Sequence, residues 1–140
     1  EFGVEMTDLA TLMEKSDFIS VNCTLNPSSH HLINADSLSL CKPDAIIINT
    51  ARGPIVEEQA LIHSLSIGQI GGAALDVFEV EPLPLDSPLM KMDNVMLAPH
   101  NSNSSPYFWE RVHWNTIFNL LKAFQIDIKD VDLLRKMEKL

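Results

Sequence analysis

The chain has 140 residues, of which 46% are hydrophobic and 21% charged, and its formal net charge is −9. This length and composition suit one globular domain, and they exclude a two-domain enzyme within the chain and a disordered or fibrous protein. The negative charge, without any basic cluster, argues against nucleic acid as a partner, and the lack of a leader pattern or a run of about 20 apolar residues predicts a cytoplasmic protein without a membrane partner.

Helical and strand patterns alternate along the chain. Helices are expected where apolar residues recur at three- and four-residue intervals after a capping residue, and strands where β-branched residues cluster. In chain order the sequence predicts a helix over 7–13 capped by Thr7 or Asp8, a strand over 18–23, a helix from Asn34 to Leu40, a strand over 45–49, a helix with Pro54 in its first turn that ends at Gly68, a strand over 70–77, an irregular proline-rich loop over 81–88 and a strand over 95–98.

The strand over 45–49 indicates the fold class. Ile46, Ile47 and Ile48 follow one another without polar alternation, which is typical of a strand buried on both faces in a parallel sheet that helices cover. Strands and helices that alternate with short connections indicate right-handed βαβ crossovers. We therefore expect an α/β protein with a doubly wound parallel sheet.

A long helix is predicted to follow the last strand. Ser104 or Ser105 can cap it and Pro106 suits its first turn. Five residues, most of them apolar, recur at three- and four-residue intervals, which predicts one buried face: Trp109, Val112, Thr116, Leu120 and Phe124. In the tail over 126–140, Val131, Leu134 and Met137 also have helical spacing, which suits a surface helix or a docking tail.

Chemically active side chains follow three of the predicted strands. Arg52 comes after the isoleucine strand, Glu81 after the next one and His100 after the last. Because the carboxyl ends of parallel strands share one edge of a sheet, these residues should meet there. Taken singly, Arg52 could be a surface residue, Glu81 a solvated loop residue and His100 a cap for a backbone carbonyl. Together, a guanidinium fork and a histidine beside a carboxylate suit a small acid that exchanges a proton.

Three compound motifs in the same order carry a resemblance to a known family. They are Asn49–Val56 (NTARGPIV), Gly71–Pro82 (GGAALDVFEVEP) and Asn94–His100 (NVMLAPH). They closely resemble signatures of the D-2-hydroxyacid dehydrogenases, including the phosphoglycerate dehydrogenase-like members, over residues 4–124. The resemblance implies a Rossmann-type fold and hydride transfer between a nicotinamide cofactor and C2 of a 2-hydroxy or 2-keto acid.

The resemblance also implies catalytic roles. Arg52 would bind the substrate carboxylate and polarise the carbonyl group. His100 would act as the general acid in reduction and the general base in oxidation. Glu81 would pair with His100 and favour its protonated form.

Cofactor contacts are implied as well. Asp76 would face the nicotinamide carboxamide, although it could also be a polar cap on a strand end. Asn22 and Thr24 stand where many relatives have histidine and proline, and the run over 101–105 differs from the glycine-containing run of many relatives. The residues expected to contact NAD, or NADP, are Asn22, Cys23, Thr24, Thr50, Ala51, Arg52, Asp76 and His100.

The glycine-rich turn that opens a dinucleotide-binding fold has no counterpart among the five glycines of the chain, and with it the residue that separates NAD from NADP is missing. We therefore expect residues 1–125 to be the C-terminal portion of a dinucleotide-binding domain, without its first βαβ unit, followed by a helical tail over 126–140. The chain would be a fragment of an enzyme that is a homodimer when whole.

Two further expectations concern metals and function. Cys23 and Cys41 lie in apolar stretches, and their spacing suggests neither a metal site nor a secreted disulfide framework. The alternative to an enzyme fragment is a catalytically inactive, NAD(H)-responsive interaction module of the corepressor type. Retention of Arg52, Glu81 and His100 favours the enzyme, since a pure binding module does not need this set.

Overall fold

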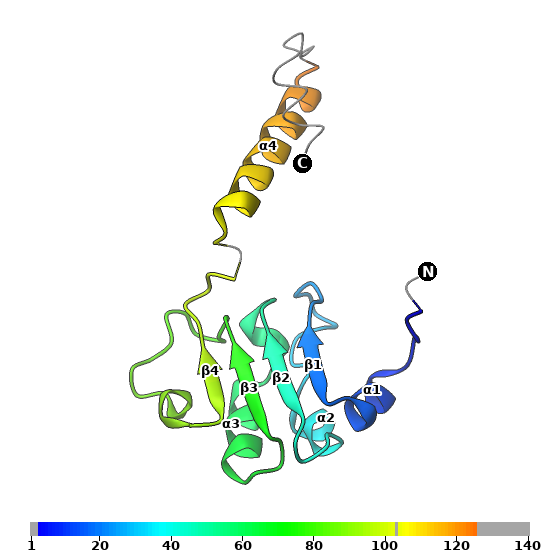
Figure 1. Cartoon of the computed structure of the whole chain (residues 1–140), viewed down its shortest axis with the longest axis vertical. Helices are drawn as coiled ribbons and strands as arrows, with labels where there is room; N and C mark the ends of the chain where they lie inside the picture. Colours follow the sequence, from blue (N-terminus) through cyan, green and yellow to red (C-terminus); the bar gives the residue numbers. More distant parts are fainter. Residues whose placement is uncertain (1–2, 103, 126–140) are drawn as a thin grey trace. The chain divides into compact units, whose positions relative to one another are not determined.

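The computed structural model describes residues 3–102 and 104–125. The chain divides into two compact units, Glu1–His100 and Asn101–Leu140, and the predicted tail over 126–140 lies outside the described residues. The first unit holds the sheet and the second holds one long helix (Figure 1). Among the residues described, no helix is long and apolar enough to span a bilayer.

The first unit is a four-stranded parallel sheet with the strand order β1-β2-β3-β4. This confirms the predicted α/β class, and each strand lies within its predicted range. The elements are α1 (Leu9–Lys15), β1 (Phe18–Val21), α2 (Ala35–Ser39), β2 (Ile46–Asn49), the 3₁₀ helix η1 (Gly53–Ile55), α3 (Glu58–Ser66), β3 (Gly72–Leu75), the 3₁₀ helix η2 (Pro88–Lys91) and β4 (Val95–Leu97).

Capping side chains define where the first two helices begin. Of the two candidates for α1, the structure selects Asp8, whose carboxylate accepts the backbone N–H of Thr11 at 2.8 Å. The predicted cap of α2, Asn34, is confirmed, because it accepts the N–H of Ser37 while the Ser37 hydroxyl accepts the N–H of Asn34. Both caps satisfy amides that have no partner within the helix.

The helix predicted with Pro54 in its first turn begins later than expected. Pro54 belongs to η1, and α3 starts only at Glu58. The reason lies in the chain between them, which is extended because it bonds to the loop before α2. Ile33 donates to the carbonyl of Ile55 at 3.1 Å, and Glu57 donates to the carbonyl of Ile33 at 2.8 Å. Gly68 follows the helix with φ +68°, as its predicted role at the helix end requires.

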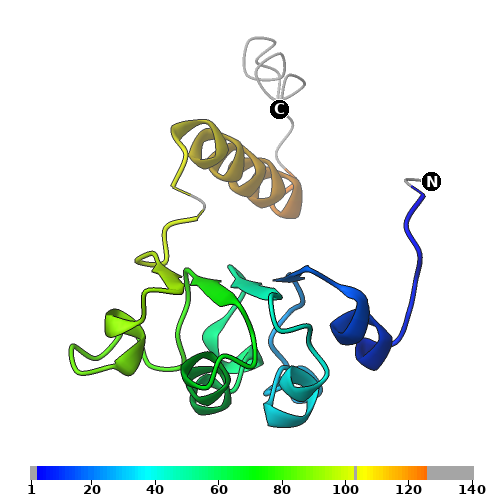
Figure 2. The same ribbon diagram turned by 60° about the horizontal axis from the view of Figure 1, so that its bottom comes forward.

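The core lies between the sheet and the helices. Figure 2 shows α2 and α3 beneath one face of the sheet. Alternate strand residues on this face are buried, and they pack with helix side chains into one cluster that includes Met13, Ile19, Val21, Leu38, Ile47, Leu61, Leu65, Ala73 and Leu75. Burying each larger aliphatic side chain contributes roughly 1.5–3 kcal/mol.

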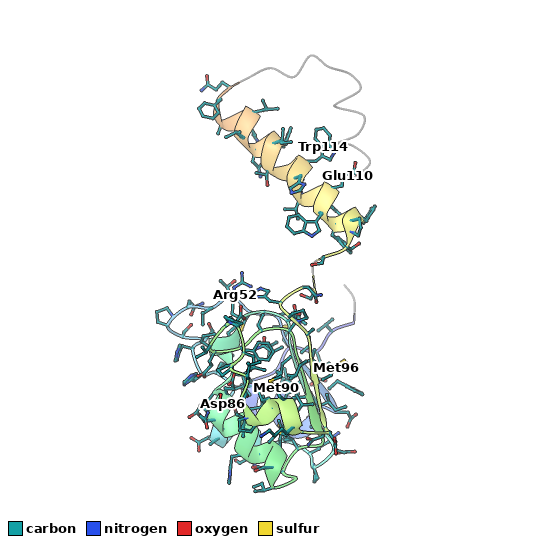
Figure 3. The ribbon with its side chains drawn as sticks, turned by 90° about the vertical axis from the view of Figure 1, so that its left-hand side faces the viewer. Arg52, Asp86, Met90, Met96, Glu110 and Trp114 are labelled. Carbon is teal, nitrogen blue, oxygen red and sulfur yellow. The ribbon has the colours of Figure 1, made fainter. Side chains whose placement is uncertain are left out.

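The expectation of burial on both faces of β2 is wrong for residues 3–100. Ile47 is fully buried, whereas Ile46 and Ile48, which point to the other face, are only partly buried. On that face Phe18 is 68% exposed and Met96 is 73% exposed, and Met96 is seen on the side away from the helices in Figure 3. An unbroken apolar run shows that both faces of a strand are suited to burial. It does not show that helices cover the second face of the sheet.

The long helix of the second unit is α4 (Pro106–Ala123), and Ser105 is its N-cap residue, one of the two predicted. Within the second unit taken by itself, none of the α4 residues is buried, including those of the predicted buried face. Trp109 is 47% exposed and Leu120 is 55% exposed. An apolar stripe becomes buried only against a partner surface, and the described part of the second unit is a single helix.

Candidate active site

The carboxyl edge of the sheet gathers the three predicted catalytic residues within the first unit. Arg52 follows β2, Glu81 belongs to the loop after β3, and His100 follows β4. Figure 3 shows Arg52 at this edge, whereas Asp86 and Met90 lie towards the other end of the unit. The topology therefore places the three residues as the parallel sheet predicts.

The turn that carries Arg52 is shaped by Asn49, the last residue of β2. This residue is almost fully buried, with 1% exposure. The Asn49 amide oxygen accepts the N–H of Ala51 at 3.0 Å, and its NH₂ group donates to the carbonyl of Arg52 at 3.0 Å. These bonds fold the chain sharply at the end of the strand, as an Asx turn does, and so direct Arg52 outward from the edge.

Gly53 completes this turn because nothing larger fits. A Cβ atom at Gly53 would lie 1.8 Å from the carbonyl oxygen of Phe78 and 2.5 Å from the backbone nitrogen of Glu79. The segment carrying Arg52 therefore packs directly against the Phe78–Glu79 peptide, the start of the loop that carries Glu81.

Glu81 and His100 are in direct contact. Glu81 Oε2 lies 2.8 Å from His100 Nδ1, and Glu81 Oε1 accepts the N–H of Phe78 at 3.0 Å. Both carboxylate oxygens are thus fixed. The His100 side chain is 45% exposed, so it remains accessible to a ligand. His100 also has φ +53°, a left-handed backbone conformation in which strain is often associated with functional sites.

The pKa of the Glu81 carboxyl is held below its ordinary value of 4.5. The largest cause is the hydrogen bond with His100, followed by the bond from the Phe78 N–H; partial burial opposes them, and the charges of His100 and Arg52 add to the lowering. Glu81 is therefore ionised at neutral pH and accepts the proton on His100 Nδ1. Nε2 is then the nitrogen that can exchange a proton with a ligand.

A cavity of about 570 Å³ adjoins this pair. Its walls are mostly apolar, and its lining residues are Phe78, Glu81, Pro82, Leu83, Met90, Leu97, Ala98, Pro99 and His100. A largely apolar cavity with a few convergent polar groups is the usual form of a small-molecule site.

A second hollow, of about 490 Å³, lies beside Arg52. Six of the predicted cofactor residues line it together with Leu25: Asn22, Cys23, Thr24, Thr50, Ala51 and Arg52. Its hydroxyl, amide and guanidinium groups suit a ligand with polar and anionic groups. A nicotinamide dinucleotide has both. The loop after β1 and the turn after β2 are therefore side by side at this edge.

Asp76 and His100 complete the predicted cofactor set, and they do not line the second hollow. Asp76 follows β3 with 4% exposure, and its backbone N–H donates to the carbonyl of Asn49 at 3.0 Å. Arg52 lines the second hollow and Glu81 the first, and the charge of Arg52 adds slightly to the lowering of the pKa of Glu81.

Three further groups shape this edge, and the sequence analysis above does not include them. These are the buried amide of Asn49, the backbone N–H of Phe78 and the Cβ-free surface of Gly53. An asparagine that ends a buried strand is a recognisable turn signal, so the role of Asn49 could have been found. The other two depend on contacts between segments distant in sequence.

The chain is similar in sequence to known proteins. Residues 1–102 match the family described as "D-isomer specific 2-hydroxyacid dehydrogenase, NAD binding domain". A glyoxylate reductase from Thermofilum pendens is 43% identical over 143 residues, which cover 98% of this chain and 42% of that protein. Glyoxylate/hydroxypyruvate reductase B from Shigella boydii is 48% identical over 124 residues, which cover 89% of this chain and 38% of that protein.

A solved structure of the same family is also similar to this chain. The D-isomer specific 2-hydroxyacid dehydrogenase from Xanthobacter autotrophicus Py2, in complex with NADPH and MES, is 48% identical with a TM-score of 0.64, and the match covers 66% of this chain and 29% of that one. The chain thus spans about two-fifths of the length of the curated relatives, 42% and 38% in the two cases. By the match over residues 1–102, it belongs to the D-isomer specific 2-hydroxyacid dehydrogenase family.

Proposed function

We propose that this chain carries the acid–base part of an NAD(P)-dependent oxidoreductase that interconverts 2-keto acids and D-2-hydroxy acids. The observation that carries the proposal is the contact of 2.8 Å between Glu81 Oε2 and His100 Nδ1, at the same sheet edge as Arg52. An ionised carboxylate that holds one imidazole nitrogen leaves the other free for general acid–base work.

Each residue has a defined task in the reaction. His100 donates the proton on Nε2 to the C2 oxygen of the keto acid in reduction, and takes it back in oxidation. Glu81 stabilises the imidazolium through Nδ1. Arg52 offers a planar fork of N–H donors that matches the substrate carboxylate and polarises the neighbouring carbonyl.

The second hollow would hold the cofactor. Thr50, Ala51 and Arg52 form one wall, and Asn22, Cys23 and Thr24 form the other. When bound, the nicotinamide supplies or accepts the hydride at C2. The relatives' names make glyoxylate and hydroxypyruvate the first substrates to test, and the NADPH complex makes NADPH the first cofactor.

The test is an assay of the whole protein that contains this chain, with a panel of 2-keto acids and both NADPH and NADH. We expect oxidation of the reduced cofactor with at least one 2-keto acid. His100→Asn should lower kcat by about 10²–10⁴-fold. His63→Asn, an exposed histidine of α3, is the matched control and should leave kcat unchanged.

Two outcomes would contradict the proposal. Full activity in His100→Asn would remove His100 from the reaction. Cofactor binding without turnover of any 2-keto acid would favour the alternative of an inactive interaction module that responds to NAD(H).

A further inference from the structure

The loop after β3 carries a second carboxylate–imidazole pair. Glu79 Oε1 lies 2.7 Å from His31 Nε2, and the side chains of His31 and Glu79 are 36% and 30% exposed. His31 has φ +50°, in the same left-handed region as His100. A contact with this exposure contributes little to stability by itself, but it holds the Glu79 side chain in place at the loop.

Glu79 also serves as a cap for α3. The N-cap residue of this helix, Glu57, makes no side-chain capping bond. Glu79 Oε1 instead accepts the N–H of Glu58 at 3.2 Å, across 21 residues of sequence. In return, Glu58 Oε2 accepts the N–H of Glu79 at 3.2 Å. The two bonds have the reciprocal pattern of a capping box, but they join a helix to a distant loop.

The reciprocal bonds fix the Phe78–Glu79 peptide. This peptide lies between the turn that carries Arg52 and the loop segment that carries Glu81. Its N–H is bound by Glu58, and its carbonyl lies against Gly53, where an added Cβ would come within 1.8 Å. One peptide earlier, the N–H of Phe78 binds Glu81. Movement of this peptide would therefore disturb both Arg52, next to Gly53, and the carboxylate that holds His100.

We propose that Glu79 is a positioning residue, which by capping α3 and bonding His31 fixes the Phe78–Glu79 peptide and thereby the placement of Glu81 against His100. The inference rests on the proposed function only in treating Glu81 and His100 as the acid–base pair. The groups that face Glu79 are His31 and Glu58, and those that act on Glu81 are His100 and Arg52.

The test measures the carboxyl ¹³C shift of Glu81 against pH by NMR in the full chain. In the native chain the pKa of Glu81 is lowered by its bonds with His100 and the Phe78 N–H. Glu79→Ala releases the peptide, so we expect the pKa of Glu81 to rise towards its ordinary value. Glu79→Gln keeps an oxygen that can accept the N–H of Glu58, and it should restore the low pKa in large part.

Asp17→Ala is the matched control. It breaks a side-chain contact of the same 2.7 Å length, the ion pair with Lys42 beside the amino ends of β1 and β2, and should leave the titration of Glu81 unchanged. An equal rise in Asp17→Ala, or no rise in Glu79→Ala, would overturn the proposal. If Glu79→Ala does not fold, Glu79→Asp tests the same point, because its shorter carboxylate cannot reach both His31 and Glu58, and an unchanged pKa of Glu81 there would be equally negative.

The NMR titration contains neither substrate nor cofactor. A whole protein without dehydrogenase activity would therefore refute the proposed function and leave the positioning by Glu79 standing. If the pKa of Glu81 is the same in Glu79→Ala as in the native chain, the positioning role of Glu79 is refuted, whatever the activity of the whole protein.

Discussion

Glu79 and Glu81, two residues apart on the loop after β3, each bind a histidine ring and a backbone amide. Glu79 holds His31 and the N–H of Glu58, whereas Glu81 holds His100 and the N–H of Phe78. The first carboxylate ties the loop to α3, and the second orients the histidine at the cavity. One short loop thus combines a structural anchor with a chemical group.

Arg52→Lys should impair catalysis much more than folding. The Arg52 side chain is exposed, and its guanidinium donates to the adjacent carbonyl of Ala51 at 2.6 Å, so little stability depends on it. A lysine cannot offer the bidentate fork, and losing one charge-assisted hydrogen bond costs about 1.5–3 kcal/mol, or about 10- to 100-fold in kcat/KM. Steady-state kinetics of the whole protein measure this, with Arg111→Lys in α4 as the control. Unchanged kcat/KM would rule out the role of Arg52.

Glu81→Gln should change how stability depends on pH. Because the pKa of Glu81 in the folded chain lies below its ordinary value of 4.5, its ionised form contributes stability above that pH, and this is lost as the pH falls through the lowered pKa. The native chain should therefore exceed Glu81→Gln in the free energy of unfolding near neutral pH, and the difference should vanish in acid. Since both partners are a third or more exposed, the difference should be at most about 1 kcal/mol.

Urea unfolding at several pH values measures this difference, and a double-mutant cycle with His100→Gln assigns it. If the contact of Glu81 with His100 is responsible, Glu81→Gln should have a smaller effect in the His100→Gln background. Equal effects in both backgrounds would show that the stabilisation comes from elsewhere.

Gly53→Ala should destabilise the chain by about 3 kcal/mol, because the new methyl group would overlap the backbone of Phe78 and Glu79. Gly68→Ala is the comparison. Gly68 has φ +68° and no atom near its missing Cβ, so only the left-handed penalty of about 1–2 kcal/mol applies. Urea unfolding of the two variants separates the effects, and an equal loss of stability would contradict the tight contact at Gly53.

Local signals in the sequence were sufficient for most of the first unit. The isoleucine run located β2, and the cap at Asn34 located α2. The general property that parallel strands end at one edge was enough to predict that Arg52, Glu81 and His100 gather there. These features depend on neighbours in sequence or on topology alone.

The features that could not be predicted depend on contacts between distant segments. Pro54 suits a helix start, but Ile33 draws the following residues into an extended pairing, and α3 begins later. The cap that Glu79 gives to α3 spans 21 residues, and no local pattern marks it. The burial expected for α4 likewise depends on a partner surface, because periodicity describes a face and not what covers it.

The strands lie in the sheet in the same order as in the sequence. Each parallel pairing therefore closes between successive strands, which keeps the contacts comparatively local and allows the sheet to grow from one strand to the next during synthesis. Arg52, after β2, and Glu81, after β3, would then reach their places before β4 is added. His100 arrives after them, so its contact with Glu81 forms only when β4 has docked, and a chain interrupted before Val95 would keep the carboxylate without its histidine.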